Sequence, residues 1–168
     1  AAQHIGDRSE QQDRVAIFPH PTHKGALLAV LADGMGGHSG GSLAAEQVIF
    51  KAKHAFEAAR PNAENVRATL ANAINDAHDS IKLAAISAEQ DPHSTACVLI
   101  LQPGRADWAY CGDSRIYLFR NGEKRSRTLA PGARGPTLSP ARMRGLKGSP
   151  STALRSSPNT RQKARLTK

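Results

Sequence analysis

The stretch Ala26-Leu-Leu-Ala-Val-Leu-Ala-Asp-Gly-Met-Gly-Gly-His-Ser-Gly-Gly41 decides how this 168-residue chain is interpreted. Its first part, Ala26–Ala32, is continuously apolar, which is typical of a strand covered on both faces. The strand carries Asp33 at its end, and five glycines within residues 34–41 free the backbone to approach an ion or a phosphate. Taken alone, the stretch predicts either such a site or a glycine-rich turn with a structural aspartate. It does not match the GxxxxGK[ST] phosphate loop, because no lysine follows.

Two helices and four further strands are predicted around this stretch. The helices run from Ser42, a suitable N-cap, to about Arg60 and from about Glu64 to Ile86, with apolar residues at three- and four-residue steps. Strands are expected at Arg14–Phe18, Ala26–Ala32, Ala96–Leu101, Asp107–Cys111 and Arg115–Phe119, the last three as an antiparallel meander. Because the helices follow each other directly, we expect an α+β fold with both packed on a mostly antiparallel sheet.

The composition changes after Glu123. All 14 acidic residues lie at or before Glu123, whereas residues 124–168 carry 12 of the 23 lysines and arginines and no aromatic residue, valine or isoleucine. Such a segment buries too little apolar surface to offset an ordering cost of about 1–2 kcal/mol per residue. We therefore expect a globular part at residues 1–123 and a disordered, basic, Pro/Gly/Ser-rich tail at residues 124–168.

Other features exclude several classes of protein. The longest apolar run has seven residues, far fewer than a membrane-spanning helix requires, so we expect no membrane association. The chain start has neither the basic patch nor the apolar stretch of a signal peptide, and Cys97 and Cys111 suggest reduced core residues rather than a disulfide framework. We therefore expect a cytoplasmic monomer.

Several short motifs at predicted strand ends occur together in one order. They are Arg8-Ser-Glu-Gln-Gln-Asp13, Asp33-Gly-Met-Gly-Gly-His38, Ser94-Thr-Ala96 and Gly112-Asp-Ser-Arg115. In this order, residues 3–123 resemble the bacterial branch of the metal-dependent, type 2C serine/threonine protein phosphatases. Asp13 and Asp113 alone would each be interpreted as a solvated turn residue, so the combination carries the resemblance.

The resemblance implies a four-layer αββα sandwich with a two-metal site between its sheets. Asp13 and Asp33 would be metal-ligating carboxylates, the Gly34 carbonyl another ligand, and Asp113 a ligand of a more weakly held third ion. Arg8 would anchor the substrate phosphate, and Arg8, Asp13 and Asp33 would be the catalytic residues. The implied cofactors are Mn²⁺ or Mg²⁺, and the implied partners are a phosphorylated protein substrate and an opposing serine/threonine kinase.

The chemistry of these residue types agrees with that implication. Carboxylate and carbonyl oxygens select hard ions such as Mg²⁺ or Mn²⁺ over zinc, and two such ions can lower the pKa of a bridging water. The planar guanidinium of an arginine can hold two phosphate oxygens.

The sequence departs from the family pattern in three ways. Gln12 stands where the family usually has glutamate, which weakens an acidic contact of the expected site. Met35 follows Asp-Gly where the animal enzymes have a candidate general-acid histidine, and His38, three residues later, is equally well a loop residue. The further half-domain that supplies a Ser-Asp-Gly strand end and a late Asp-Asn pair is not recognisable. The fold is therefore expected to be incomplete, and residues 124–168 are a frameshifted, truncated or natural tail.

Parts of the sequence are open to three other interpretations. A cysteine phosphatase requires a Cys-x5-Arg loop, and Arg115 stands at the wrong spacing from Cys111. The basic tail could attract nucleic acid, although without aromatic residues it supports only nonspecific phosphate contacts. A non-catalytic pseudophosphatase fragment would share every motif above and lack turnover.

Overall fold

The main sheet of this computed structural model is antiparallel and runs in the order β1-β2-β4-β5-β8, with the short β3 paired to the end of β2. The structure describes residues 4–7, 10–36, 40–60, 65–88, 91–128 and 137–142. The strands of this sheet are β1 (Asp13–Pro19), β2 (Leu27–Met35), β3 (His93–Ser94), β4 (Ala96–Gln102), β5 (Arg105–Cys111) and β8 (Thr137–Arg142).

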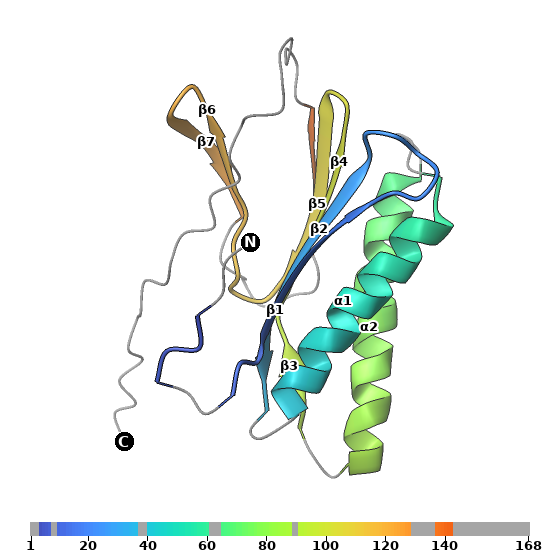
Figure 1. The fold of residues 1–168 in the computed structure, drawn as a ribbon, viewed down its shortest axis with the longest axis vertical. Helices are drawn as coiled ribbons and strands as arrows, with labels where there is room; N and C mark the ends of the chain where they lie inside the picture. The colour runs from blue at the N-terminus through green and yellow to red at the C-terminus, as the bar shows by residue number, and fades with distance from the viewer. Residues whose placement is uncertain are drawn as a thin grey trace.

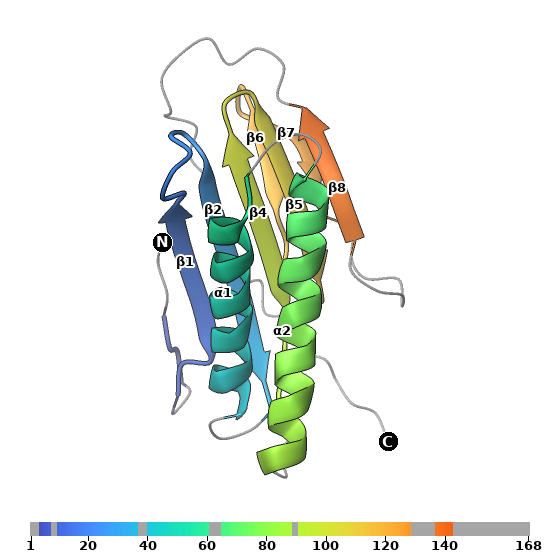
Figure 2. The same ribbon diagram turned by 90° about the vertical axis from the view of Figure 1, so that its right-hand side faces the viewer.

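Both helices cover the same face of this sheet. Helix α1 (Gly40–Ala58) lies over β1 and β2, and α2 (Val66–Ala88) lies beside it over β4 and β5 (Figure 2). The two helices follow each other between β2 and β3, as the sequence predicts, and the α+β fold class is confirmed. None of the described helices is long and apolar enough to cross a membrane.

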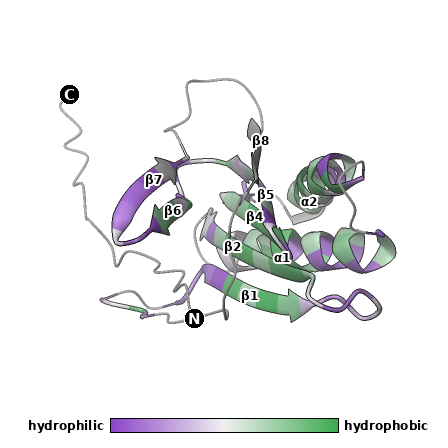
Figure 3. Cartoon of the chain, turned by 90° about the horizontal axis from the view of Figure 1, so that it is seen from above, coloured by the Kyte–Doolittle hydropathy of each residue, from purple (hydrophilic) through white to green (hydrophobic). Residues whose placement is uncertain are grey.

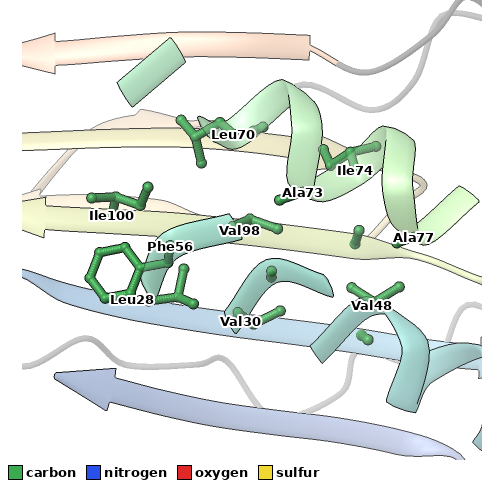
Figure 4. Close-up of a cluster of buried hydrophobic side chains, with 14 of the residues drawn as sticks. Leu28, Val30, Val48, Phe56, Leu70, Ala73, Ile74, Ala77, Val98 and Ile100 are labelled. Carbon is green, nitrogen blue, oxygen red and sulfur yellow. The ribbon is translucent and has the colours of Figure 1, made fainter. Parts of the chain in front are cut away.

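The main core lies between the helices and the sheet. On β2, alternate residues Leu28, Val30 and Ala32 are buried towards the helices, where they meet Phe56 of α1. Figure 4 shows Leu28, Val30 and Phe56 with Val98 and Ile100 of β4 and with apolar side chains of α2. Each large side chain buried in this way contributes about 1.5–3 kcal/mol, so this packing holds β2 and its end in place.

A second apolar cluster lies on the opposite face of the sheet. It contains Cys97, Leu99, Ala106, Trp108 and Tyr110, with the half-buried Ala29 and Leu31 of β2 packed against it. Strand β2 therefore has apolar contacts on both faces, as its continuous apolar sequence predicts. On this side lies a two-stranded sheet, β6 (Tyr117–Arg120) and β7 (Glu123–Arg127), opposite the helices (Figure 3).

The expected three-stranded meander is wrong in its last member. Strands β4 and β5 form the predicted hairpin, but residues 117–120 pair with β7 and not with β5. The chain leaves the main sheet at Gly112, whose φ is +96°. Beyond this point, the backbone N–H of Thr128 donates a hydrogen bond to the carbonyl oxygen of Ile116 at 3.0 Å. The other edge of β5 is paired with β8.

The expectation of disorder throughout residues 124–168 is also wrong where the structure describes this segment. Most of β7 and the whole of β8 lie within it. A strand needs a hydrogen-bonding partner for its backbone rather than large apolar side chains. The edge of β5 is that partner for β8, and the Asn121-Gly122 turn brings β7 alongside β6. Residues 129–136 and 143–168 lie outside the described residues.

Candidate metal centre at the ends of β1 and β2

Asp13 and Asp33 are Cα partners in the β1–β2 ladder. Opposed residues of an antiparallel pair extend to the same face of the sheet. The adjacent bond from Gly34 N–H to the Gln12 carbonyl, 3.3 Å long, marks Asp13 and Asp33 as a non-hydrogen-bonded pair. In such pairs the Cα atoms are about 4.5 Å apart, which brings the side chains closest together. The structure thus brings together two residues that the sequence places 20 positions apart.

This pair lies on the face away from the helices, because Leu28, Val30 and Ala32 alternate with it along β2. The end of β2, which carries Asp33, is paired with β3, and Figure 1 shows β3 at the lower end of the main sheet, next to the start of α1. Two like charges at directly opposed positions disfavour pairing. A divalent cation between them would reverse this effect, and carboxylate oxygens suit Mg²⁺ or Mn²⁺.

Gly34 is the point at which α1 approaches the sheet. A Cβ at this residue would lie 2.0 Å from the carbonyl oxygen of Gly41 and 2.8 Å from that of Gln12, so only glycine fits. Gly41 is similarly restricted, because a Cβ there would lie 2.6 Å from Oε1 of Gln12. The Gln12 side chain therefore lies against the start of α1, and Gly34, the predicted ligand, lies between that helix and β1.

Asp113 lies on an exposed turn that is tied to the end of β2 through Thr95. The hydroxyls of Thr95 and Ser114 are 2.7 Å apart, and Thr95 Oγ1 also accepts the backbone N–H of Asp33 at 3.1 Å. Burial, and next the nearby Asp113 carboxylate, raise the pKa of Cys97 to about 12. Cys97 is the Cα partner of Leu31 in the β2–β4 ladder, so Asp113 approaches the face that carries Asp33.

The described residues do not assemble a complete ligand shell. Among them, no three histidine, cysteine, aspartate or glutamate side chains gather as a group that could hold a metal. Asp13 and Asp33 are brought together, whereas Asp113 remains a separate group. Arg8 and His38 lie outside the described residues, so the predicted phosphate anchor is not placed. The described residues therefore offer two facing carboxylates, which are donors of the type that hard cations prefer, and do not form a complete site.

Arg14 is a residue of this region that the sequence did not single out. Its Nη1 donates to the carbonyl oxygens of Gln11 at 2.6 Å and Asp13 at 3.0 Å. Its Nη2 donates to Ser42 Oγ and to Glu46 Oε1, the latter at 2.9 Å. The Arg14 side chain thus fastens the segment before β1 to the first turns of α1. Ser42 is not the predicted N-cap, because the helix begins at Gly40, and its hydroxyl serves Arg14 instead.

Comparisons with known proteins assign this arrangement to a family. The family model described as "Protein phosphatase 2C" matches residues 2–134, which is most of the chain and extends past the expected boundary at residue 123. The chain belongs to the protein phosphatase 2C family. Asp13, Asp33, Gly34 and Asp113 all lie within the match to the protein phosphatase 2C model.

One similar protein of established function is bacterial. The chain is 33% identical over 106 residues to the serine/threonine protein phosphatase PstP of Mycobacterium tuberculosis, a match that covers 60% of this chain and 20% of PstP. The chain therefore corresponds to about a fifth of the length of that protein phosphatase 2C relative.

Two solved structures illustrate the shared fold. A bacterial serine phosphatase variant superposes with a TM-score of 0.71 at 24% identity, covering 82% of this chain and 66% of that one. The catalytic domain of PstP, in complex with two manganese ions, superposes with a TM-score of 0.64 at 25% identity, covering 82% of this chain and 68% of that one. The protein phosphatase 2C fold is confirmed for most of the chain.

Proposed function

We propose that this chain carries metal-binding residues of a protein serine/threonine phosphatase that uses Mn²⁺ or Mg²⁺ to hydrolyse phosphoserine and phosphothreonine. The observation that carries the proposal is the direct opposition of Asp13 and Asp33 on one face of the sheet. Membership of the protein phosphatase 2C family supports the reaction class. The manganese ions in the PstP structure support the choice of cation.

Bound divalent cations would supply an activated water and neutralise charge at the transferring phosphoryl group. The residues of this chain bind and position. The Asp13 carboxylate on β1 and the Asp33 carboxylate on β2 bind cations, and the close contact of Gly34 with α1 holds the end of β2 in place. Arg8 is proposed to hold the substrate phosphate, and Asp113 to bind a weaker third ion.

We further propose a phosphorylated protein as the substrate, an opposing serine/threonine kinase as the functional partner, and a cytoplasmic monomer as the working form. The compartment is proposed from the sequence alone, because two cysteines in a chain of this size do not make a disulfide framework. In the structure both are free thiols, and they extend to opposite faces of the neighbouring strands β4 and β5.

The test of the cation site is a calorimetric titration of the full chain with Mn²⁺. Asp33→Asn should weaken binding by about tenfold or more, because it removes one of two facing carboxylates. Asp76→Asn on the exposed side of α2 is the matched control and should bind like the wild-type chain. Equal affinity in all three proteins would contradict the proposal.

The chain alone should be a poor catalyst. Within its described residues only two of the expected carboxylates meet, so even in millimolar Mn²⁺ we expect turnover of a phosphothreonine peptide to be about a hundredfold or more below that of an intact relative. Comparable turnover would show that other residues of this chain complete the site. The same incomplete donor set favours, as a second candidate, a non-catalytic pseudophosphatase that retains cation binding and has no turnover.

A further inference from the structure

Thr95 lies between β3 and β4 at a point where two separate parts of the site region meet. It is one of few polar residues inside the described structure, with 2% of its surface exposed. Its backbone N–H donates to the carbonyl oxygen of Asp33 at 2.9 Å, and its hydroxyl oxygen accepts the N–H of Asp33 at 3.1 Å. Thr95 therefore holds both backbone polar groups of Asp33.

The same hydroxyl contacts the turn that carries Asp113. Thr95 Oγ1 and Ser114 Oγ are 2.7 Å apart, a hydrogen bond in which either oxygen can donate. A hydroxyl has one donor and two acceptor positions. The Thr95 hydroxyl can therefore accept a hydrogen bond from the Asp33 N–H and at the same time form one with the Ser114 hydroxyl. The single hydroxyl thus binds both segments.

The methyl group of Thr95 completes the contact. A Cβ built on Gly112 would lie 2.7 Å from Thr95 Cγ2, and Gly112 has a φ of +96°, so the turn closes tightly over this side chain. The hydroxyl and the methyl group thus contact the same turn, one at Ser114 and the other at Gly112, on either side of Asp113.

We propose that Thr95 is a positioning residue that couples the end of β2 at Asp33 to the Asp113 turn through its buried hydroxyl. The inference deepens the proposed function, because the two segments it joins carry carboxylates expected to bind cations. Displacement of the turn would then be transmitted to the Asp33 backbone over two hydrogen bonds. The residue itself touches neither substrate nor cation.

Two substitutions separate the hydroxyl from the shape of the side chain. Thr95→Val keeps the shape and removes the hydroxyl, whereas Thr95→Ser keeps the hydroxyl and removes the methyl group. Amide hydrogen exchange, followed by NMR on the full chain without metal, should show Asp33 exchanging about five- to tenfold faster in Thr95→Val, as expected for one lost hydrogen bond. Thr95→Ser should restore slow exchange, and Val30 in the same strand should be unaffected in both variants.

A third variant tests the other hydrogen bond and guards against poor folding of Thr95→Val. Ser114→Ala removes only the contact from the turn, so the amide resonances of Gly112 and Asp113 should shift and Asp33 should show a smaller increase in exchange. Unchanged Asp33 exchange in both Thr95→Val and Ser114→Ala would overturn the proposal. Equal effects of Thr95→Val and Thr95→Ser would also overturn it, because packing rather than the hydroxyl would then be responsible.

A parallel Mn²⁺ titration distinguishes this inference from the proposed function. If the wild-type chain binds Mn²⁺, Thr95→Val should bind it several-fold more weakly and Thr95→Ser should bind it normally. If the wild-type chain binds none, the proposed function fails, while the exchange comparison in metal-free protein still upholds or overturns the Thr95 coupling.

Discussion

Asp13 of β1 and Asp33 of β2 occupy directly opposed positions at the ends of their strands, on the sheet face away from the helices. Two carboxylates in a non-hydrogen-bonded pair are as close as an antiparallel sheet allows. Such a pair is unfavourable for folding unless a positive charge lies near it. A bound divalent cation would offset this repulsion, which is why the two aspartates are the residues to test for cation binding.

The two aspartates should therefore act as one unit. Asp13→Asn should remove most of the increase in melting temperature that Mn²⁺ produces, since a ligand stabilises only the state that binds it, by about 2.7 kcal/mol at a hundred times its Kd. In EDTA its melting temperature should equal or exceed that of the wild-type chain. The double variant with Asp33→Asn should lose no more Mn²⁺ stabilisation than either single variant. Additive losses, measured by calorimetric scans, would show two independent sites.

Arg14 should matter for stability because it joins β1 to α1 through backbone carbonyls as well as side chains. Arg14→Ala should lower the free energy of unfolding by about 2 kcal/mol in urea titrations, a value discounted because the side chain is 29% exposed. Arg14→Lys should recover little, since an ammonium lacks the planar fork. As a control, Glu57→Gln breaks only the surface pair with Lys53 and should cost about 0.5 kcal/mol or less. Equal losses for Arg14→Ala and Glu57→Gln would refute this role.

The thiols should differ in reactivity and in their effect on alkaline stability. Burial raises the pKa of Cys97 from 9.0 to about 12, so the folded state favours the protonated thiol. The contribution of the protonated Cys97 thiol to the free energy of unfolding is complete below pH 9. It is lost as the pH rises towards 12, because the thiol of the unfolded chain loses its proton at a lower pH than that of the folded chain. The free energy of unfolding should fall less steeply between pH 9 and 11 in Cys97→Ala than in wild type. At pH 8, iodoacetamide should modify the exposed Cys111 and spare Cys97, as mass spectrometry would show.

The basic segment should bind nucleic acid only nonspecifically. With about six phosphates engaged, affinity for DNA and RNA alike should fall roughly a thousandfold between 50 and 200 mM salt. The segment cannot be tested by removing residues 124–168, because this deletes β8 and most of β7. Removal of residues 143–168 keeps both strands and should abolish most binding in gel-shift titrations. Sequence-selective binding that resists salt would instead indicate nucleic-acid recognition.

Much of the fold follows from local patterns in the sequence. The continuous apolar run of β2, the apolar faces of the two helices and the Asn121-Gly122 turn are all signals within short windows, and the structure confirms the elements that they predict. The motif order also predicted the family and the residues to examine. These predictions succeed because a buried face requires a repeat of two or about 3.6 residues, whatever the element packs against.

Tertiary pairing decided the rest. The opposition of Asp13 and Asp33 depends on the register of the β1–β2 ladder, and the Thr95 contact joins residues 62 positions apart. The third strand of the expected meander turned away at Gly112, and β8 paired with β5 although its sequence has no aromatic residue and only one β-branched residue, Thr137. Strand pairing uses the backbone N–H and C=O groups, which every residue except proline has. Composition alone therefore did not reveal which segment would pair with the edge of β5. The sequence by itself determined the elements and the carboxylates, and the three-dimensional pairing of strands decided which of them meet.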